Sequence, residues 1–224
     1  MNNCMVIAPH PDDETLGCGG TLLKHKTNGD EIHWLILTQI SEDEGWSKKR
    51  VKSRPKEIEM VTEAYGFNSV HELDFKAKKL DTVPTSDLVE RIGAVINKIQ
   101  PNTLYINNRC DIHTDHQIAF KAVISCTKNF RYPFINRVYM YETLSETEFS
   151  PPLPGYAFQP NMFVDISEKF EQKLKIMQFY DGEILEDPYP RSLKSLEFLA
   201  RYRGSRIGVK YAEAFMLIFE AWKS

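Results

Sequence analysis

Residues 4–20 read CMVIAPHPDDETLGCGG, and this stretch combines a strand signal with a cluster of charged side chains. Residues 4–8 form a short apolar run that is typical of a buried β-strand. His10 and three successive acidic residues at 12–14 come directly after it. Neighbouring carboxylates repel one another, so their clustering indicates that a cation offsets the repulsion.

Strand-like and helix-like segments alternate over the first 125 residues. Runs of β-branched and aromatic residues predict strands at 31–38, 70–74 and 103–107. Apolar residues at helical spacing predict helices at 48–65 and 85–99, and glycine or proline stop signals follow these two and the helix expected at 16–28. A further helix is expected at 113–127. This alternation predicts an α/β fold with a Rossmann-like, mostly parallel sheet and helices on both faces. The active site is expected at the carboxyl ends of the strands, where ligands of such sheets bind.

The remaining chain continues with mixed signals around the proline-rich segment SPPLPG. It predicts strands at 137–141 and 162–165 and helices at 167–186 and 191–203. Residues 211–220 fit a strand or a helix, and a short strand is favoured. No internal repeat, low-complexity segment or linker is evident. We therefore expect one domain over residues 1–224.

Composition and charge exclude several classes of protein. The net charge of −3 gives no basic excess, so nucleic-acid binding is not expected. No apolar stretch reaches 18 residues, so no membrane span is expected. A strand that begins by residue 4 or 5 leaves no room for a signal peptide, which predicts a cytoplasmic protein. The four cysteines lack metal-site spacing and are expected to be reduced thiols.

A second charged cluster, DIHTDH at residues 111–116, follows another predicted strand. In a parallel sheet both clusters come to the same edge. His10 and Asp13 with one further histidine would supply two imidazoles and a carboxylate, which suits Zn²⁺ with a position left open for water. His113 and His116 stand three apart at a helix start and share one face, so either or both could be ligands.

Other readings of these motifs are weaker. The glycines of GCGG do not form G-x-G-x-x-G, since residue 22 is leucine, and the preceding acids would repel a pyrophosphate. We expect them to let a helix pack close to the sheet. No G-x-S-x-G motif is present, and acidic neighbours would raise the pKa of Cys18. A purely structural role, as a helix cap or a salt bridge, would explain a single charged cluster. It explains less well why two such clusters both follow predicted strands.

The stretch APHPDDETLGCGG at 8–20, with HTDH at 113–116, resembles the LmbE-like (PIG-L) family of zinc-dependent N-deacetylases. The resemblance extends to LTQISEDEG at 37–45, YMYE at 139–142 and the segment from PRSLKS to YAEAF at 190–215. Thr114 stands where the family's second motif usually has proline, a position that is not a ligand. The resemblance implies hydrolysis of an N-acetyl group on a glucosamine-containing substrate.

The resemblance also assigns the metal centre. His10, Asp13 and His116 match the metal ligands, which implies one Zn²⁺ per chain, with Fe²⁺ or Co²⁺ as alternatives. Asp12 matches the general base that takes a proton from water. For Glu14, the alternatives are a backbone amide and the N-terminus of the following helix.

Further matches concern the reaction and the substrate. His113 matches the residue that stabilises the oxyanion or protonates the leaving amine, and Asp115 is expected to orient His113 and keep it cationic. Arg54, Glu44 and Asp74 match substrate-binding positions. For Arg54 the alternative is an ion pair with an acidic residue of its own helix.

The expected partner is therefore a small-molecule amino sugar, and a homo-oligomer is compatible with the sequence. The main alternative is an amidase for a larger N-acyl conjugate. A non-catalytic sugar-binding protein is less favoured, because the whole set of matched site residues is present. Three arginines could contact either an anionic substrate or the protein's own carboxylates: Arg201, Arg203 and Arg206.

Overall fold

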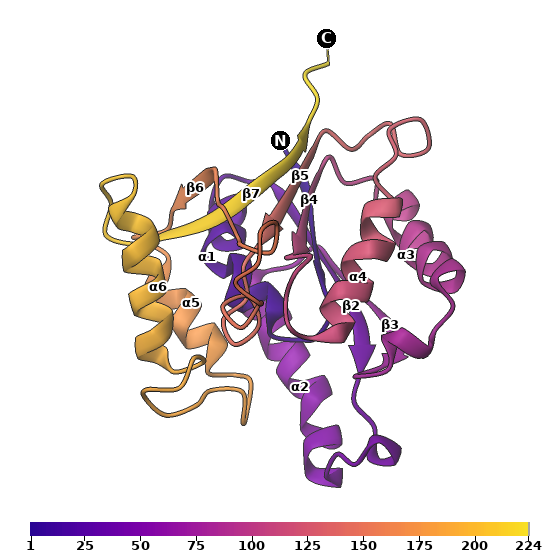
Figure 1. Ribbon diagram of the computed structural model, residues 1–224, viewed down its shortest axis with the longest axis horizontal. Coiled ribbons are helices and arrows are strands. Elements are labelled where there is room, and N and C mark those ends of the chain that lie inside the picture. Colours follow the sequence, from indigo (N-terminus) through magenta and orange to yellow (C-terminus); the bar gives the residue numbers. More distant parts are fainter. Residues whose placement is uncertain (224) are drawn as a thin grey trace.

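A seven-stranded β-sheet with the order β3-β2-β1-β4-β5-β7-β6 organises the chain, in a computed structural model that describes residues 1–223 (Figure 1). Five neighbouring strands run parallel: β3 (Ser69–Lys76), β2 (Glu31–Gln39), β1 (Asn3–Ala8), β4 (Thr103–Asn107) and β5 (Arg137–Tyr141). At the other edge β7 (Ala212–Glu220) pairs antiparallel with β5 and with β6 (Met162–Asp165). The predicted mostly parallel α/β sheet is confirmed.

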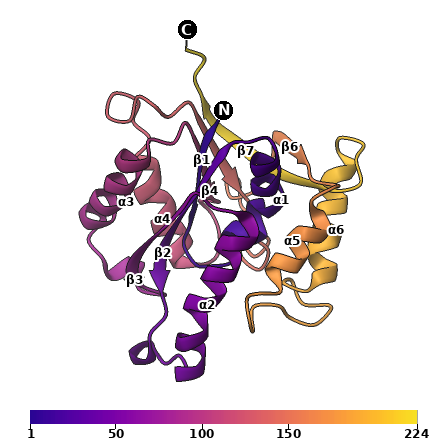
Figure 2. The ribbon, with the colours of Figure 1, turned by 180° about the vertical axis from the view of Figure 1, so that it is seen from behind.

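Helices cover both faces of the sheet (Figures 1 and 2). One face packs against α1 (Asp13–Thr27), α2 (Lys48–Tyr65), α5 (Phe170–Met177) and α6 (Leu193–Ser205). The other packs against α3 (Thr85–Ile99) and α4 (Thr114–Ser125). Alternate residues of β1 enter the two apolar cores, which explains why a strand buried on both faces reads as one continuous apolar run.

Helix α1 is interrupted at Cys18, whose φ of −143° and ψ of 20° are not helical. Glu213 of β7 accepts hydrogen bonds from both backbone N–H groups of residues 20–21, at 2.8 and 2.7 Å. Lys173 of α5 pairs with Glu213 at 2.7 Å and donates to the carbonyl of Leu16 at 2.9 Å. A buried ion pair therefore caps both ends of the break, since it supplies the partners that the interrupted helix lacks.

The glycines next to this break allow the close packing that the sequence predicts. A Cβ atom on Gly17 would overlap the ring of Tyr141 in β5. A Cβ atom on Gly20 would lie 2.7 Å from the Cβ of Ile166. Helix α1 therefore lies closer to the sheet than larger side chains permit, and this fixes the position of its N-terminus.

Replacing Glu213 with alanine is expected to lower the free energy of unfolding by about 3–5 kcal/mol, because Lys173 would stay buried without a partner. Denaturant titration measures this change. The control is Asp181→Ala, which removes an exposed ion pair with Lys49 and should hardly change stability. Equal stability of the two variants would contradict the role of Glu213.

The predicted helix over 167–186 is wrong in its second half. Helix α5 ends at Met177, and a turn with Gly182 at φ +79° follows it. This lets Glu183 line the cavity described below. Helix α6 begins after Ser192, whose hydroxyl accepts the N–H of Ser195 at 3.1 Å. Helix α1 also begins three residues earlier than predicted.

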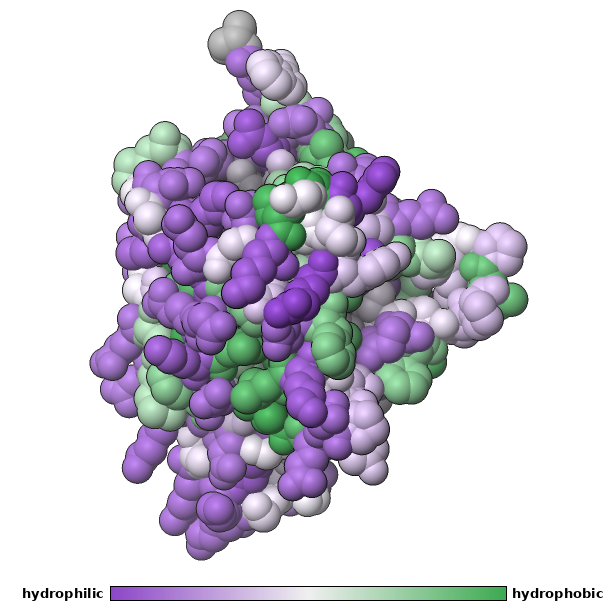
Figure 3. Space-filling view, turned by 90° about the vertical axis from the view of Figure 1, so that its left-hand side faces the viewer, coloured by the Kyte–Doolittle hydropathy of each residue, from purple (hydrophilic) through white to green (hydrophobic). Residues whose placement is uncertain are grey.

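On the side of the molecule shown in Figure 3, hydrophilic side chains dominate and hydrophobic ones are scattered between them. None of the helices within residues 1–223 combines the length and apolarity that crossing a membrane requires. All four cysteines are free thiols, as expected.

Candidate metal centre

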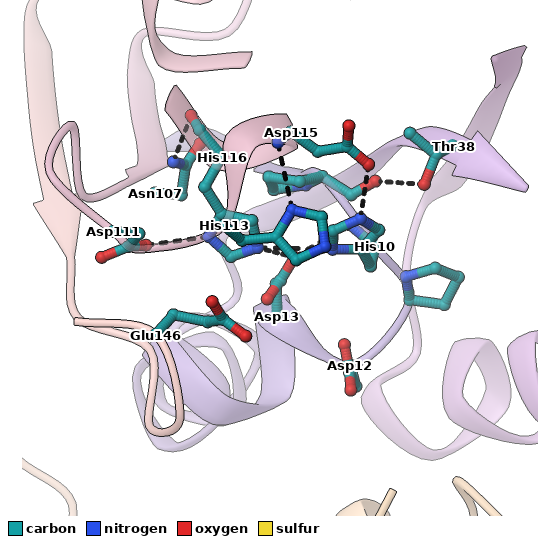
Figure 4. A network of polar contacts seen from close by, with 12 residues as sticks. His10, Asp12, Asp13, Thr38, Asn107, Asp111, His113, Asp115, His116 and Glu146 are labelled. Carbon is teal, nitrogen blue, oxygen red and sulfur yellow. Dashed lines mark hydrogen bonds and ion pairs between the residues drawn. The ribbon is translucent and has the colours of Figure 1, made fainter. Parts of the chain in front are cut away.

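Two turns at the carboxyl edge of the sheet bring the charged clusters together (Figure 4). His10 to Asp13 connect β1 to α1, and His113 to His116 form the start of α4, which follows β4. Because β1 and β4 are parallel neighbours, these turns lie side by side. The sequence argument for a shared edge therefore agrees with the structure.

Three donor atoms form a nearly regular triangle. His10 Nδ1 lies 3.3 Å from His116 Nε2 and 3.5 Å from Asp13 Oδ2. His116 Nε2 lies 3.3 Å from the same Asp13 oxygen. Ligands of a tetrahedral Zn²⁺ stand about 3.3 Å apart, given ligand distances of about 2.0–2.1 Å. These three residues thus have the chemistry and the separations that one bound ion requires.

Carboxylates hold the outer nitrogens of both imidazoles. His10 Nε2 lies 3.0 Å from Asp115 Oδ2, and His116 Nδ1 lies 2.8 Å from Asp111 Oδ2. Such contacts fix the ring orientation and leave the inner nitrogen free for a metal. Burial alone would lower the pKa of His10, but its hydrogen bonds to Asp115 and Asp13 raise that pKa to about 9. The centre therefore favours positive charge.

A second set of side chains, His10, His113 and Asp115, also lies close enough to share an ion. The Asp115 carboxylate already accepts the backbone N–H groups of Lys78 and Leu80, at 2.6 and 3.1 Å, as well as His10 Nε2. These bonds occupy its oxygens. The geometry thus favours the set with Asp13.

The expectation that Asp115 orients His113 is wrong. Its carboxylate bonds to His10 instead, whereas His113 Nδ1 accepts the backbone N–H of Asp115 at 3.0 Å. His113 is the N-cap of α4, so its ring folds back onto the first helical turn. Asp115 lies inside that turn, and its carboxylate bonds to His10 and to the N–H groups of Lys78 and Leu80 rather than to the His113 ring.

His113 is also not held cationic. Burial, together with the charges of His10 and His116, lowers the pKa of His113 to about 4. A neutral ring that accepts at Nδ1 carries its proton on Nε2. Since His113 lines the cavity, Nε2 can donate a hydrogen bond to an oxygen bound there.

Asp12 is a buried carboxylate beside this centre. Burial, Glu183 and Asp13 raise its pKa well above the usual range, in that order of importance. Arg191 and Arg54 oppose the shift, and Arg191 Nη1 lies 3.4 Å from Asp12 Oδ2. A carboxylate with a raised pKa is a better proton acceptor near neutral pH.

The backbone of Asp12 has φ +131°, a conformation that non-glycine residues rarely adopt. Its N–H donates to Glu14 Oε2 at 3.1 Å, and its carbonyl accepts the N–H of Leu16 at 2.8 Å. Glu14 itself is fully buried and also accepts from Tyr180 Oη at 2.6 Å. Both expectations for Glu14 are met, because it accepts a backbone amide and lies in the first turn of α1.

A cavity of about 260 Å³ opens above the cluster, near the lower end of the range for small-molecule sites, about 300 Å³. Arg54 lines it but is largely occupied: it pairs with Glu183 at 2.7 Å and with Glu57 at 3.4 Å. The wall also includes residues that sequence reasoning did not select, namely Trp46, Lys78, Thr143, Glu146, Glu183 and Arg191.

Two predicted substrate residues lie outside the cavity wall. Asp74 pairs with Arg91 at 2.5 Å, and its side chain is 63% exposed. It has φ +52° beside a register shift between β2 and β3, which turns its side chain outwards. Glu44 pairs with Lys76 at 3.2 Å. The expected substrate contacts of Asp74 and Glu44 are therefore corrected.

Some missed residues had a signal in the sequence and others had none. Asp111 belongs to DIHTDH, and a carboxylate five residues before a ligand histidine could have been selected as its partner. Glu183 and Arg191 lie far from Asp12 in the sequence. The sequence predicts helices at 167–186 and 191–203, and nothing in that pattern connects either residue with the cavity. Of the arginines left open, Arg203 pairs with Glu142 at 2.6 Å and Arg201 with Glu197 at 2.9 Å.

One family profile matches more than half of the chain, and two curated relatives are deacetylases. Residues 5–127 match a family profile described as PIG-L, GlcNAc-PI de-N-acetylase. A diacetylchitobiose deacetylase of Thermococcus kodakarensis is 28% identical over 225 residues, covering 97% of this chain and 84% of that protein. A probable N-acetyl-α-D-glucosaminyl L-malate deacetylase 2 of Bacillus cereus is 25% identical, covering 84% of this chain and 87% of that protein.

Solved structures share the fold along the whole chain. The conserved protein TT1542 of Thermus thermophilus superposes with a TM-score of 0.78 and 25% identity, covering 100% of this chain and 98% of that one. The N,N′-diacetylchitobiose deacetylase of Pyrococcus horikoshii gives a TM-score of 0.76 and 22% identity, covering 96% and 83%. At 22% identity, the similarity to the Pyrococcus horikoshii structure shows a shared fold only.

Proposed function

The chain belongs to the PIG-L (GlcNAc-PI de-N-acetylase) family, and from this premise we propose that it removes the N-acetyl group from an N-acetylglucosamine-type sugar or conjugate. The observation that carries the proposal is the triangle of His10, Asp13 and His116 donor atoms beside the buried Asp12 carboxylate. The relatives that act on N-acetylated sugars support it.

In this proposal His10, Asp13 and His116 hold a divalent metal ion, with Zn²⁺ as the expected one. When bound, the ion supplies Lewis-acid chemistry: it polarises the acetyl carbonyl and makes a water more acidic. The outer carboxylates Asp111 and Asp115 keep the two imidazoles in the orientation that this chemistry requires.

The remaining steps belong to the chain's own side chains. Asp12 accepts a proton from the attacking water, because its raised pKa makes it a stronger base than an ordinary aspartate. His113 donates from Nε2 to the oxygen that becomes negative as water adds to the amide carbon. The C–N bond then breaks, and Asp12 returns its proton to the leaving nitrogen. The products are acetate and a primary amine.

The proposal is tested by measuring primary-amine release from free N-acetylglucosamine, N,N′-diacetylchitobiose and N-acetylglucosaminyl malate. We expect release from at least one sugar, its loss after treatment with a chelator and its return on adding Zn²⁺. If no sugar reacts although the protein holds one ion per chain, the deacetylase proposal fails for these substrates.

Asp111→Asn is expected to weaken metal binding about 10–100-fold, because His116 would lose the carboxylate that fixes its ring. Competition with a chromophoric chelator measures this affinity. Asp43→Asn, on the exposed 3₁₀ turn at 42–44, serves as the control and should keep the original affinity. An unchanged affinity in Asp111→Asn would exclude this orienting role.

A further inference from the structure

The backbone of Asp12 is the most unusual one in the described chain. It has φ +131° and ψ −27°, at the point where the turn after β1 enters α1. The four other non-glycine residues with positive φ have values between +52° and +76°, close to the left-handed region that such residues sometimes adopt. Asp12 lies well outside that region. A conformation of this kind persists where the surrounding contacts enforce it.

The side chain of Glu14 makes one of these contacts. The N–H of Asp12 donates to Glu14 Oε2 at 3.1 Å. The carbonyl of Asp12 accepts the N–H groups of Thr15 and Leu16, at 3.0 and 2.8 Å, which are bonds that any helix start can form. Within residues 1–223, Glu14 supplies the one side-chain hydrogen bond to the Asp12 backbone. Glu14 is therefore the contact specific to this conformation.

The Glu14 carboxylate is itself held in place. Its other oxygen accepts the hydroxyl of Tyr180 at 2.6 Å and the hydroxyl of Thr15 at 2.5 Å. Glu14 and Tyr180 are both buried, so these hydrogen bonds take the place of water. Tyr180 belongs to the segment after α5 and stands 166 residues from Glu14 in the sequence. The turn at Asp12 is thus tied to a distant part of the chain.

Glu14 has no place in the wall of the cavity, whereas Asp12 lines it. Any effect of Glu14 on a bound molecule therefore passes through Asp12. Glu14 also has no ion-pair partner within the described part of the chain, so no cation offsets its burial. Burying a polar group costs folding free energy that an apolar side chain would not cost. Stability alone does not explain a carboxylate at this position.

Resting on the proposed deacetylation, we propose that Glu14 is a positioning residue for Asp12. Its carboxylate, held by Tyr180, keeps the Asp12 peptide at positive φ and so fixes where the Asp12 side chain points. Rotation about the N–Cα bond turns that side chain relative to the preceding residues, so a relaxed φ moves the proton acceptor away from the attacking water. The carboxylate of Asp13 is held separately, by the N–H of His10 at 2.8 Å. Loss of the Glu14 contact should thus reduce turnover and leave metal binding intact.

Replacing Glu14 tests this role through a split between kcat and KM. Glu14→Ala should lower kcat about 10–100-fold, while KM and metal affinity stay within about threefold of the wild type. Glu14→Gln should restore most of the activity. Its amide oxygen can accept the Asp12 N–H, and its NH₂ group can donate to the Tyr180 hydroxyl. A Glu14→Gln variant as slow as Glu14→Ala would overturn the proposed contact.

Tyr180→Phe tests the same contact while the carboxylate stays in place, so it decides the matter if Glu14→Ala does not fold. It should lower kcat in the same direction. The matched control is Tyr105→Phe, which removes another buried hydroxyl, bonded to His25 at 2.8 Å outside the cavity wall. This control should keep its kcat. An unchanged kcat in Tyr180→Phe, or an equal loss in both variants, would overturn the inference.

Crystal structures of Glu14→Ala and Tyr180→Phe separate this inference from the proposed reaction, because they report φ of Asp12 whether or not a sugar reacts. We expect φ to relax towards negative values and the Asp12 carboxylate to leave its place in the cavity wall. If φ stays near +131°, the inference is wrong even though sugars are deacetylated. If φ relaxes but the wild type releases no amine from any sugar, the positioning contact stands and the deacetylase proposal fails.

Discussion

Asp12→Asn should lower kcat about a thousandfold while the protein keeps its metal, because the variant loses the proton acceptor and no metal ligand. Asparagine has nearly the same shape as aspartate, so the backbone at φ +131° and its hydrogen bond to Glu14 should persist. Amine release under substrate saturation measures kcat, and mass spectrometry of the acid-digested protein measures bound metal.

Thermal unfolding of the metal-free Asp12 variant distinguishes lost catalysis from a damaged fold. The folded state raises the pKa of Asp12, so ionised Asp12 costs folding free energy at pH values above its unfolded pKa. This cost is absent at lower pH, where the carboxyl is protonated in both states. Removing the charge should therefore leave Tm at pH 7 unchanged or raise it.

The control for this variant is Asp74→Asn, which changes an exposed carboxylate outside the cavity wall. It should retain full activity. A kcat within tenfold of the wild type in Asp12→Asn would remove Asp12 as the base. A low kcat together with a much lower Tm would attribute the loss to unfolding.

His116→Ala should abolish both metal binding and activity, because only His10 and Asp13 of the proposed ligands would remain. The variant also leaves the buried Asp111 carboxylate without one of its partners. We expect the free energy of unfolding to fall by about 1–3 kcal/mol for that reason. Metal analysis after dialysis and denaturant titration measure the two effects.

A matched control is His71→Ala, a histidine of β3 outside the cavity wall, which should keep the full metal content. Full occupancy in His116→Ala would instead assign the ion to the second group, His10, His113 and Asp115. Loss of metal in both variants would point to a general effect on folding.

Local signals explain why much of the fold could be predicted from the sequence. Helix α2 has the predicted bounds 48–65, because Ser47 caps its start and Gly66 ends it at φ +67°. Strand β4 and helix α3 also have the predicted bounds. The meeting of the two charged clusters followed from the rule that parallel strands end at one edge.

Contacts made over long distances in the sequence could not be predicted in this way. The carboxylate of Asp115 has two directions available at the start of a helix, and only the neighbouring turn at 78–80 shows which one it takes. Glu183 reaches the cavity because α5 ends early, and Tyr180 in the segment that follows packs into the apolar core. Asp74 lies in β3 and Glu44 follows β2, but neither residue lines the cavity.

The Asp115 carboxylate joins the proposed metal centre to the turn at 78–80, which borders the cavity. It holds His10 with one oxygen and the turn of Lys78 and Leu80 with both. If a bound sugar tightens this turn, it also restricts the imidazole, and the ion and the sugar then share a coupling free energy. Linkage is reciprocal. If the bound ion increases the affinity for the sugar by some factor, the bound sugar increases the affinity for the ion by the same factor. Scarce metal would thus be retained best by the chains that are engaged with substrate.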